Sequence, residues 1–486
     1  MARLRELAAE LRGFAGTGLG PDDETDRLML IAALEGLARR VEDVRPFRKN
    51  PSECLTIAIS GCYLLFCRDE VPQKDRLRAL GARLRAIPRL LEQARARLDQ
   101  PVPQFVELAL GDLDGCAAFL REAVPAQAAA CPDLAAELLA ASAVAMRALE
   151  EYREFLRELL PRAASPFAIG AAAYEDLLRK TLLLGWGAEE TIAAGRRCLE
   201  ATEAELEQLA QESGRPWRHV LEECLLEEGA AGPDVVTPYH NELARLREFI
   251  IKEGLAPLPP PDTLRVVETP AFERQLVHLA AYLPPPPFEA TRLGLFWVTP
   301  PGPGAGPGLH NRSSMLVTAI HEAYPGHHVQ ALAALGQSRP ARAVAENIPF
   351  IEGWAFYCEE LMERAGYITD LGARVWRRRD QLWRAARAVV DPSLHLGRMS
   401  LAEAVEFLQR RACLSPSAAR AEALHMASEP GQSVCYLMGR LGIDELARAY
   451  AKRRGAASLS EFHARLLALG SVPPQLAARL LDAGEA

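Results

Sequence analysis

The sequence predicts a mainly α-helical protein with at most a small β-sheet, and three observations support this fold class. Most of the 486 residues lie in segments whose apolar side chains recur every three or four positions, which is typical of amphipathic helices. The strand pattern is rare, and its best examples are RVVE (265–268) and GLFWVT (294–299). Proline-rich breaks at 257–262 and 283–289 interrupt the helices and are predicted to run extended over the surface.

One segment shows the helical pattern clearly. In VAMRALEEYREFLRELLP (144–161) the apolar residues from Ala145 to Leu159 share one face, and Pro161 marks the end. The same reasoning predicts helices at 26–40, 74–98, 134–160, 172–184, 189–212, 314–335, 350–365, 372–390, 400–410 and 435–453.

Composition excludes several classes of protein. A hydrophobic fraction of 49% with 25% charged residues is typical of a globular chain and excludes a largely disordered one. The net charge of −8 argues against nucleic acid as the main partner. The N-terminus has no signal-peptide pattern and the longest apolar run, 55–66, is too short to span a bilayer, so no membrane partner is expected. Ten scattered cysteines are expected to be reduced core thiols in a cytoplasmic protein.

The chain is predicted to form one two-lobed unit, with a helical scaffold lobe over 1–250 and a catalytic lobe over 251–486. Within the second lobe, the Gly/Pro loop at 300–308 is expected to be a connector or the mobile rim of a site. The basic stretch WRRRDQLWRAAR (376–387) has two interpretations. We favour the solvated side of a helix over an anchor for an anionic substrate group.

Residues 321–328, HEAYPGHH, contain three of the ten histidines. A His–Glu pair followed by a second His at i+4 is the signature of a zinc hydrolase, because positions i and i+4 share a helix face at about 6 Å of rise. Here the spacing is longer. On an unbroken helix His321 and His327 would point about 120° apart, and His321 and His328 would lie roughly 10 Å apart along the axis.

The Pro–Gly pair inside the motif can correct this spacing. Pro325 lacks an N–H group and its ring clashes with the carbonyl of His321, whereas Gly326 tolerates nearly any backbone conformation. A two-residue bulge here would restore the i+4 relation between His321 and His327. We therefore predict these two residues as metal ligands, with His328 supporting the site or contacting substrate. The alternative is that residues 321–328 belong to a structural helix that carries polar side chains and binds no metal.

Carboxylates complete the predicted site. Glu322 should point beside the metal, where it can take a proton from metal-bound water. The third ligand is expected on a following helix, and Glu352 opens the amphipathic segment EGWAFYCEEL. Glu346 is an alternative third ligand, but it precedes Asn–Ile–Pro, where its side chain is harder to hold in one position. The predicted cofactor is Zn²⁺, bound by the two histidines and Glu352.

The strings HEAYPGHHVQ and EGWAFYCEEL resemble the bacterial family called domain of unknown function 885, which is grouped with the zinc-dependent metallopeptidases. Further matches are RPFRKNP (45–51), RAVVDPSLH (387–395), PGQSVCYLMG (430–439) and FHARLLALGSVP (462–473). The resemblance implies a large helical zincin-like fold with the metal deep in an active-site cleft, similar in layout to thimet oligopeptidase and angiotensin-converting enzyme. In those relatives a Gly precedes the second ligand His, which favours His327, and a later Glu is the third ligand, which matches Glu352.

The same resemblance implies roles for further residues. Glu322 resembles the general base, and His395 and Tyr436 resemble donors to the developing oxyanion. Arg387 is expected to bind a substrate carboxylate, with Asp391 orienting the arginine. The alternatives are helix-end capping or ion pairing for His395 and Arg387, and a core tyrosine for Tyr436.

The chain also departs from the family pattern. Ser393 stands where Gly is usual, and His425–Met426 stands where an Arg–Tyr pair is usual. Loss of the Arg–Tyr pair would leave the metal ligands intact but would change substrate preference or reduce activity.

We expect a zinc metallohydrolase that cleaves amide bonds in small peptides or peptide-like molecules, with Glu322 passing a proton to the leaving amine. One alternative is a catalytically weakened family member that binds metal and a peptide-like ligand as a biosynthetic or regulatory partner. Another is a non-haem iron oxygenase, whose facial triad also contains two His and one carboxylate but would leave Glu322 without a role.

Overall fold

The computed structural model describes residues 2–14, 18–67, 71–227, 234–270, 274, 277, 279–289, 291–301, 310–455 and 459–483. Most of the Gly/Pro loop that was predicted as a connector or rim, residues 302–308, lies outside these ranges.

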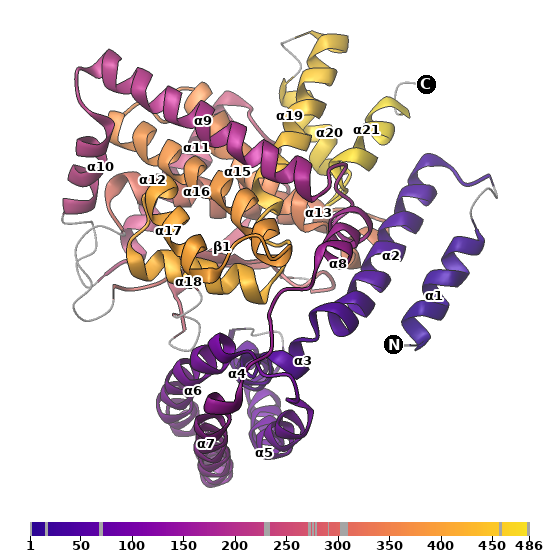
Figure 1. Ribbon diagram of the computed structural model, residues 1–486, viewed down its shortest axis with the longest axis vertical. Helices are drawn as coiled ribbons and strands as arrows, with labels where there is room; N and C mark the ends of the chain where they lie inside the picture. The colour runs from indigo at the N-terminus through magenta and orange to yellow at the C-terminus, as the bar shows by residue number, and fades with distance from the viewer. Residues whose placement is uncertain are drawn as a thin grey trace. The chain divides into compact units, whose positions relative to one another are not determined.

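The protein is mainly α-helical, and the residues in these ranges contain one three-stranded sheet, which confirms the predicted fold class (Figure 1). The helices of the described residues, with π-helical or 3₁₀ turns marked η, are α1 (Ala2–Gly13), α2 (Pro21–Arg39), η1 (Arg40–Val44), α3 (Pro46–Lys49), α4 (Ser52–Cys67), α5 (Gln73–Arg97), α6 (Pro103–Ala129), α7 (Pro132–Leu159), η2 (Leu160–Arg162), α8 (Ala171–Asp176), η3 (Leu177–Thr181), α9 (Ala188–Ser213), α10 (Trp217–Leu226), α11 (Val236–Glu253), α12 (Arg312–Glu322), α13 (His327–Leu335), α14 (Pro340–Val344), α15 (Ile348–Arg364), α16 (Leu371–His395), α17 (Leu401–Ala412), α18 (Pro416–Ser428), α19 (Cys435–Arg454), α20 (Leu459–Ala468) and α21 (Pro474–Ala483).

The sheet has the strand order β1 (Thr263–Glu268), β3 (Leu293–Val298), β2 (Ala280–Leu283). Strand β1 runs parallel to the central strand β3, and β2 runs antiparallel to it. The two predicted strand segments therefore form β1 and β3. The edge strand β2 was missed because its sequence AAYL contains no β-branched residue and no alternation of polar and apolar side chains.

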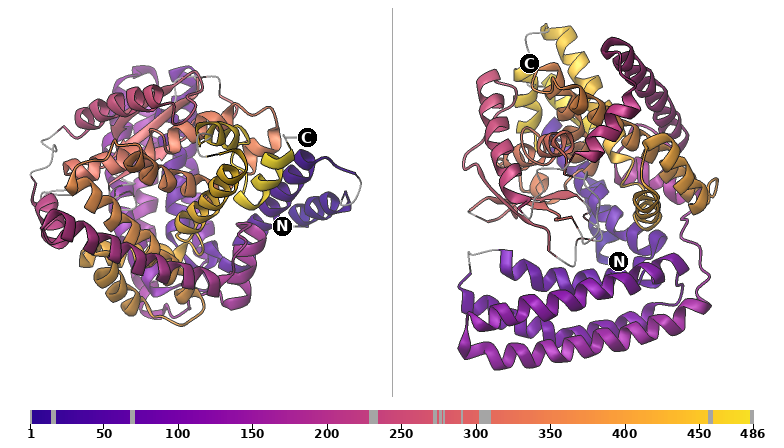
Figure 2. Two further views of the ribbon diagram at one scale, coloured as in Figure 1. Left: turned by 90° about the horizontal axis from the view of Figure 1, so that it is seen from above. Right: turned by 90° about the vertical axis from the view of Figure 1, so that its left-hand side faces the viewer.

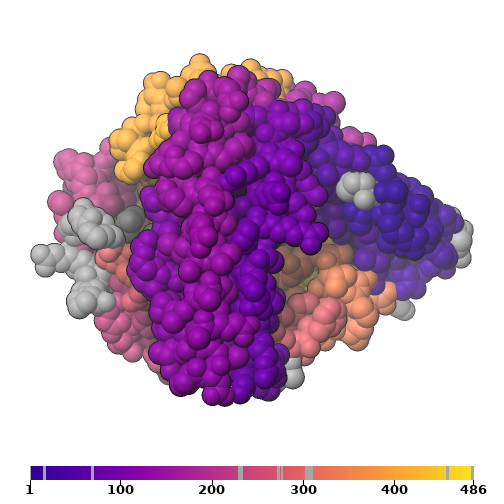
Figure 3. Space-filling model, turned by 90° about the horizontal axis from the view of Figure 1, so that it is seen from below, coloured from indigo at the N-terminus to yellow at the C-terminus, as the bar shows by residue number. Residues whose placement is uncertain are grey.

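Two compact units make up the chain. Unit 2 consists of residues 40–167 and 269–278, and unit 1 contains the rest of the chain. In unit 2 the long helices α4, α5, α6 and α7 pack side by side (Figure 2), and their apolar faces form a core of their own. Figure 3 shows the space-filling surface that the side chains of these helices make.

The division differs from the predicted boundary at 250. Helices α9 to α11 belong to the same unit as the second half of the chain, because α9 packs along α16 and α11 packs against α12 and β1. Long-range packing of this kind leaves no mark in the local sequence pattern. The HEAYPGHH and EGWA motifs both lie in unit 1.

Helices α15 and α19 approach each other unusually closely next to the motif residue Glu352. A Cβ atom on Gly353 would lie 2.3 Å from the backbone of Gly439, and one on Gly439 would lie 1.7 Å from the carbonyl oxygen of Pro349. Two glycines therefore allow backbone contact here. This contact fixes the start of α15, whose N-cap Asn347 accepts a hydrogen bond from the Phe350 N–H.

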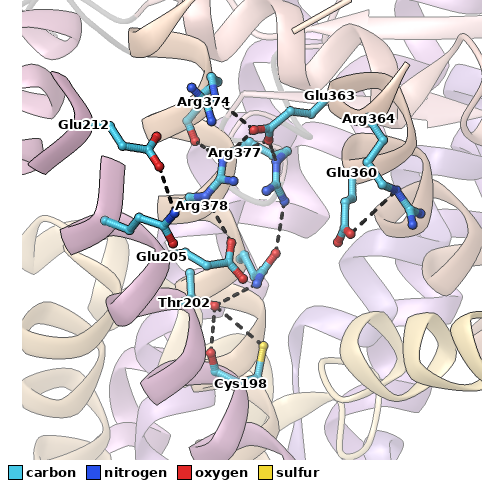
Figure 4. A network of polar contacts seen from close by, with 12 residues as sticks. Cys198, Thr202, Glu205, Glu212, Glu360, Glu363, Arg364, Arg374, Arg377 and Arg378 are labelled. Carbon is cyan, nitrogen blue, oxygen red and sulfur yellow. Dashed lines mark hydrogen bonds and ion pairs between the residues drawn. The ribbon is translucent and has the colours of Figure 1, made fainter. Parts of the chain in front are cut away.

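The basic stretch 376–387 is not the solvated side of a helix, so the favoured interpretation was wrong. It lies in α16, where Arg377 is only 2% exposed. Figure 4 shows Arg374, Arg377 and Arg378 turned toward Glu363 of α15, with the closest contacts of Arg374 and Arg378 at 3.0 and 2.9 Å. The carboxylates that neutralise these arginines come from other helices, so the local sequence could not indicate them.

Two further expectations concern cysteines and membranes. The nine cysteines whose side chains the structure describes are free thiols, as expected. In the described ranges, no helix combines the length and the apolar character that a bilayer crossing requires.

Candidate metal centre

The HEAYPGHH motif spans two helices with a bulge between them. Helix α12 ends at Glu322 and α13 begins at His327. Across the break, the Gly326 N–H donates to the Ile320 carbonyl at 3.1 Å and the Val329 N–H to the Ala323 carbonyl at 3.4 Å. Both bonds span six residues, where a regular helix spans four. This confirms the predicted two-residue bulge at the Pro–Gly pair.

Gly326 is needed for close approach. A Cβ atom at this position would lie 1.9 Å from the carbonyl oxygen of His321 and 2.4 Å from that of Ile320. Its φ of −69° is open to any residue, so the left-handed region is not the reason for the glycine. The bulge folds the chain back onto the end of α12, and only a residue without a side chain fits there.

The bulge and helix α15 bring His321, His327 and Glu352 together. One ligand atom from each lies within 4.8 Å of the other two. The carboxylate of Glu352 lies 3.4 Å from Nε2 of His327 and 3.7 Å from Nε2 of His321. The two imidazole planes are at 87° to each other, with ring centroids 4.8 Å apart. The competing Glu346 is not part of this cluster.

The cluster has the donor set and the unsatisfied atoms that a cation site requires. Among the described residues, the Glu352 oxygen that faces Nε2 of both histidines is buried and has no hydrogen-bond partner. Burying such groups without a partner costs free energy, which a bound cation would offset. Two imidazoles and a carboxylate form a ligand set that is typical of Zn²⁺. The residues present therefore fit the predicted metal.

Charge in the cluster shifts the pKa values of its members. Burial opposes ionisation of Glu352, but the nearby His327 and His321 hold its pKa well below the usual range. Burial likewise opposes protonation of His321, yet the carboxylates of Glu352 at 3.7 Å and Glu359 at 2.8 Å raise its pKa to about 9. The acidic groups thus make this pocket favourable for a positive charge.

Glu359 supports His321 from behind and was missed by the sequence analysis. Its carboxylate lies 2.8 Å from Nδ1 of His321, is fully buried, and accepts a hydrogen bond from Arg384 at 3.2 Å. The contact leaves Nε2 of His321 facing Glu352. Carboxylate–histidine pairs of this kind orient metal ligands. The signal was present, since Glu359 follows Glu352 by seven residues, two helical turns along the same face.

Replacing Glu359 with Gln should weaken zinc binding by about 10–100-fold, because the imidazole of His321 would lose its anionic partner. A competition titration with a chromophoric chelator measures this change. The matched control is Glu360→Gln on the same helix, whose side chain pairs with Arg440 instead of a cluster histidine. Equal zinc affinity in both variants would contradict the supporting role of Glu359.

Glu322 is the last residue of α12, directly beside the cluster. Burial raises the pKa of its carboxyl, while His327 and His321 act in the opposite direction. The backbone N–H of Tyr282 in the edge strand β2 donates to this carboxylate. The structure thus places Glu322 next to the ligands, as the sequence predicted, and its role as a base stays a prediction.

Tyr436 and Arg387 also lie at the cluster. The Tyr436 ring stacks on His321 with centroids 6.1 Å apart and planes at 17°. The guanidinium of Arg387 lies 4.9 Å from the centre of the Tyr436 ring and donates two hydrogen bonds to Glu422, at 2.7 and 2.8 Å. Both predicted residues are therefore near the ligands. Sequence reasoning missed Glu422, which comes from the distant helix α18.

The partner of Arg387 is Glu422 and not Asp391, which the resemblance implied. Asp391 instead accepts hydrogen bonds from the Tyr174 hydroxyl at 2.9 Å and from the Gly431 N–H at 3.1 Å. Burial raises the pKa of Asp391 to about 7, against the effect of these hydrogen bonds. Its position ties α8 and the start of α19 to α16.

His395 and His328, the two other histidines that were predicted to act at the site, make contacts that differ from those expected. His395 is fully buried, stacks on Tyr174 and donates from Nε2 to the Met426 carbonyl at 2.8 Å, so this nitrogen is not available to an oxyanion. His328 is fully buried, and both its ring nitrogens contact side chains, those of Asp262 and Tyr282. This arrangement fits support of the site and leaves no free nitrogen for a substrate.

Comparison with known proteins identifies the family. A model of a family described as "Bacterial protein of unknown function (DUF885)" matches residues 1–481. The chain belongs to the DUF885 family. No curated protein matches this DUF885 chain.

Two solved structures share the fold of this DUF885 protein. One is described as a "putative lipoprotein of unknown function" from Shewanella oneidensis, with 21% identity, a TM-score of 0.77, and coverage of 99% of this chain and 91% of the other. The second, described as a "putative lipoprotein" from Colwellia psychrerythraea, has 19% identity, a TM-score of 0.82, and coverage of 99% and 90%. At these identities the likeness establishes the fold alone.

Proposed function

We propose that this DUF885 protein is a zinc-dependent hydrolase that cleaves amide bonds in small peptides or peptide-like molecules, within a zincin-like cleft. The observation that carries the proposal is the convergence of His321, His327 and Glu352 with Glu322 beside them. A ligand set with an adjacent, partly buried carboxylate is the arrangement that metal-assisted hydrolysis requires.

A bound zinc ion would lower the pKa of a water ligand and polarise the scissile carbonyl. Glu322 would accept a proton and return it to the leaving amine. Burial raises the pKa of Glu322, and a base whose pKa approaches the working pH transfers protons in both directions efficiently. The Tyr282 N–H would hold one oxygen of Glu322, which leaves the other for the proton.

Tyr436 would donate a hydrogen bond to the oxyanion of the tetrahedral intermediate. Burial and the nearby Glu352 raise the pKa of its hydroxyl, so the group keeps its proton at neutral pH. Stacking on His321 fixes the ring. One such donor typically contributes about 10²–10³ in kcat. His395 does not fill this role through Nε2, which donates to the Met426 carbonyl.

Arg387 would supply positive charge for a substrate carboxylate. Two of its nitrogens are held by Glu422, and the ring of Trp383 lies 4.5 Å from the guanidinium on a further side. This fixed geometry favours recognition of a carboxylate near a chain end of a short substrate. The expected cytoplasmic location and the absence of nucleic-acid and membrane partners stay predictions.

Metal content tests the site. Purified wild type should contain about one zinc per chain, whereas His321→Ala and Glu352→Ala should contain little, because each removes one of three protein ligands. Inductively coupled plasma mass spectrometry measures this directly. Glu346→Ala is the matched control and should keep its zinc, since Glu346 lies outside the cluster.

Wild type that carries no metal and takes up none on dialysis against zinc would contradict the proposal. Selective uptake of Fe²⁺ in its place would favour the oxygenase alternative. With zinc present, screening a library of short peptides distinguishes a hydrolase from a binding protein of weakened activity. Release of amines that depends on zinc supports hydrolysis.

A further inference from the structure

Tyr282, on the edge strand β2, is held by a chain of polar contacts outside the ligand set. Its hydroxyl lies 3.0 Å from Nδ1 of His328, and Nε2 of His328 lies 2.9 Å from Asp262. Asp262 also accepts hydrogen bonds from the Tyr324 hydroxyl at 2.6 Å and from Arg247. Because a carboxylate only accepts, Nε2 of His328 donates to Asp262, and in the neutral imidazole Nδ1 accepts from the Tyr282 hydroxyl.

The fold leaves space for this contact. A Cβ atom on Gly294 of the central strand β3 would lie 2.7 Å from the hydroxyl of Tyr282 and 2.9 Å from Nδ1 of His328. Any side chain at position 294 would therefore push the pair apart. His328 is fully buried, and the ring of Tyr324 meets it edge to face. The middle member of the Tyr282–His328–Asp262 chain is thus fully buried, whereas Tyr282 and Asp262 are partly exposed.

The ring of Tyr282 faces a proposed metal ligand. It stacks on His327 with centroids 6.4 Å apart and planes at 16°. The two ligand histidines differ in their support. Nδ1 of His321 contacts Glu359, whereas Nδ1 of His327 has no hydrogen-bond partner among the described residues. The orientation of His327 therefore depends on ring packing, which comes from the edge-on ring of His321 at 4.8 Å and from the parallel ring of Tyr282.

We propose that Tyr282, fixed by His328 and Asp262, is a positioning residue that orients the His327 imidazole toward the metal. This inference rests on the proposed metal site. Strand β2 also packs against α12, which carries His321 and Glu322, so the same tyrosine joins both halves of the motif. His328 thus fixes Tyr282, and Tyr282 in turn orients the neighbouring His327.

Zinc affinity tests the proposal, measured by chelator competition on the full-length protein. Tyr282→Ala should raise the zinc Kd by about 10–100-fold, as losses of ligand support typically do. It should also change the visible spectrum of the Co²⁺-substituted protein. Tyr282→Phe keeps the ring but loses the hydroxyl contact that fixes it, so its zinc Kd should lie between those of Tyr282→Ala and the wild type, several-fold above the latter. Tyr282→Phe and His328→Gln break the same hydrogen bond. The zinc Kd of the double variant should therefore be no higher than the higher of the two single-variant values.

The matched control is Tyr357→Phe. It also removes a buried hydroxyl-to-imidazole contact, with His463 at 3.0 Å, and Tyr357 makes no ring contact with a proposed ligand. Its zinc Kd should equal that of the wild type. Equal affinity of Tyr282→Ala and this control would overturn the positioning role while the metal site stands.

Zinc uptake by the wild type separates this result from failure of the proposed function. Wild type that binds no zinc overturns both the metal site and the positioning role. If Tyr282→Ala fails to fold, His328→Gln and Gly294→Ala give the test, since both disturb the pair and keep the tyrosine. A several-fold weaker zinc affinity supports the role, and unchanged affinity in both contradicts it.

Discussion

Replacing Glu322 with Gln should lower kcat by about 10²–10⁴ and leave zinc binding intact, once an amide substrate is found. Gln has nearly the same shape as Glu but cannot take a proton at neutral pH. Glu322 is adjacent to the ligands without belonging to the set of three, so the metal should remain bound. Steady-state kinetics and metal analysis on the same preparation measure the two effects.

Glu360→Gln is the control for this variant, because it changes a carboxylate whose partner is Arg440, outside the ligand set. It should keep turnover within a few-fold of the wild type. Full turnover in Glu322→Gln would contradict general-base catalysis by this residue. A zinc-binding wild type that shows no Glu322-dependent activity would match the weakened family member that the departures at His425–Met426 indicate.

Replacing Gly326 with Ala should disrupt the bulge and with it the metal site. The new Cβ would lie 1.9 Å from the carbonyl oxygen of His321, so the backbone on one side must move. Overpacking of this kind typically lowers the free energy of unfolding by about 1–3 kcal/mol. Because His327 follows directly, the same shift should separate it from His321 and reduce zinc binding strongly.

Thermal unfolding and zinc titration of Gly326→Ala measure both effects. The matched control is Gly185→Ala in the same unit, where the nearest atom to the new Cβ would be the Gln475 side chain at an ordinary 3.5 Å. That variant should keep its zinc affinity. If Gly326→Ala binds zinc like the wild type, the bulge is not what sets the ligand spacing.

Short-range chemistry explains the parts of this site that the sequence predicts. A Pro–Gly pair acts on the backbone within a few residues, so the bulge between His321 and His327 follows from the string itself. Glu352 is predictable because it lies near the start of an amphipathic helix, α15. The mainly helical fold and strands β1 and β3 likewise follow from periodicity along the chain.

The residues that orient these groups come from distant parts of the chain. Asp262 precedes its partner His328 by 66 residues, and Glu422 follows Arg387 by 35. A polar side chain shows in sequence that it needs a partner, but not which one. For the arginines of 376–387 this made solvent the simplest expectation, although the tertiary structure buries and pairs them.

The sequence by itself thus determined the helical fold class, the break in the motif helix and the three side chains that meet at the candidate metal centre. Only the tertiary structure decided how these side chains are held, by Glu359 behind His321 and by Tyr282 against His327. The physical reason is range. Periodicity and backbone sterics act over one or two helical turns, whereas hydrogen-bond partners are set by the packing of whole helices and strands.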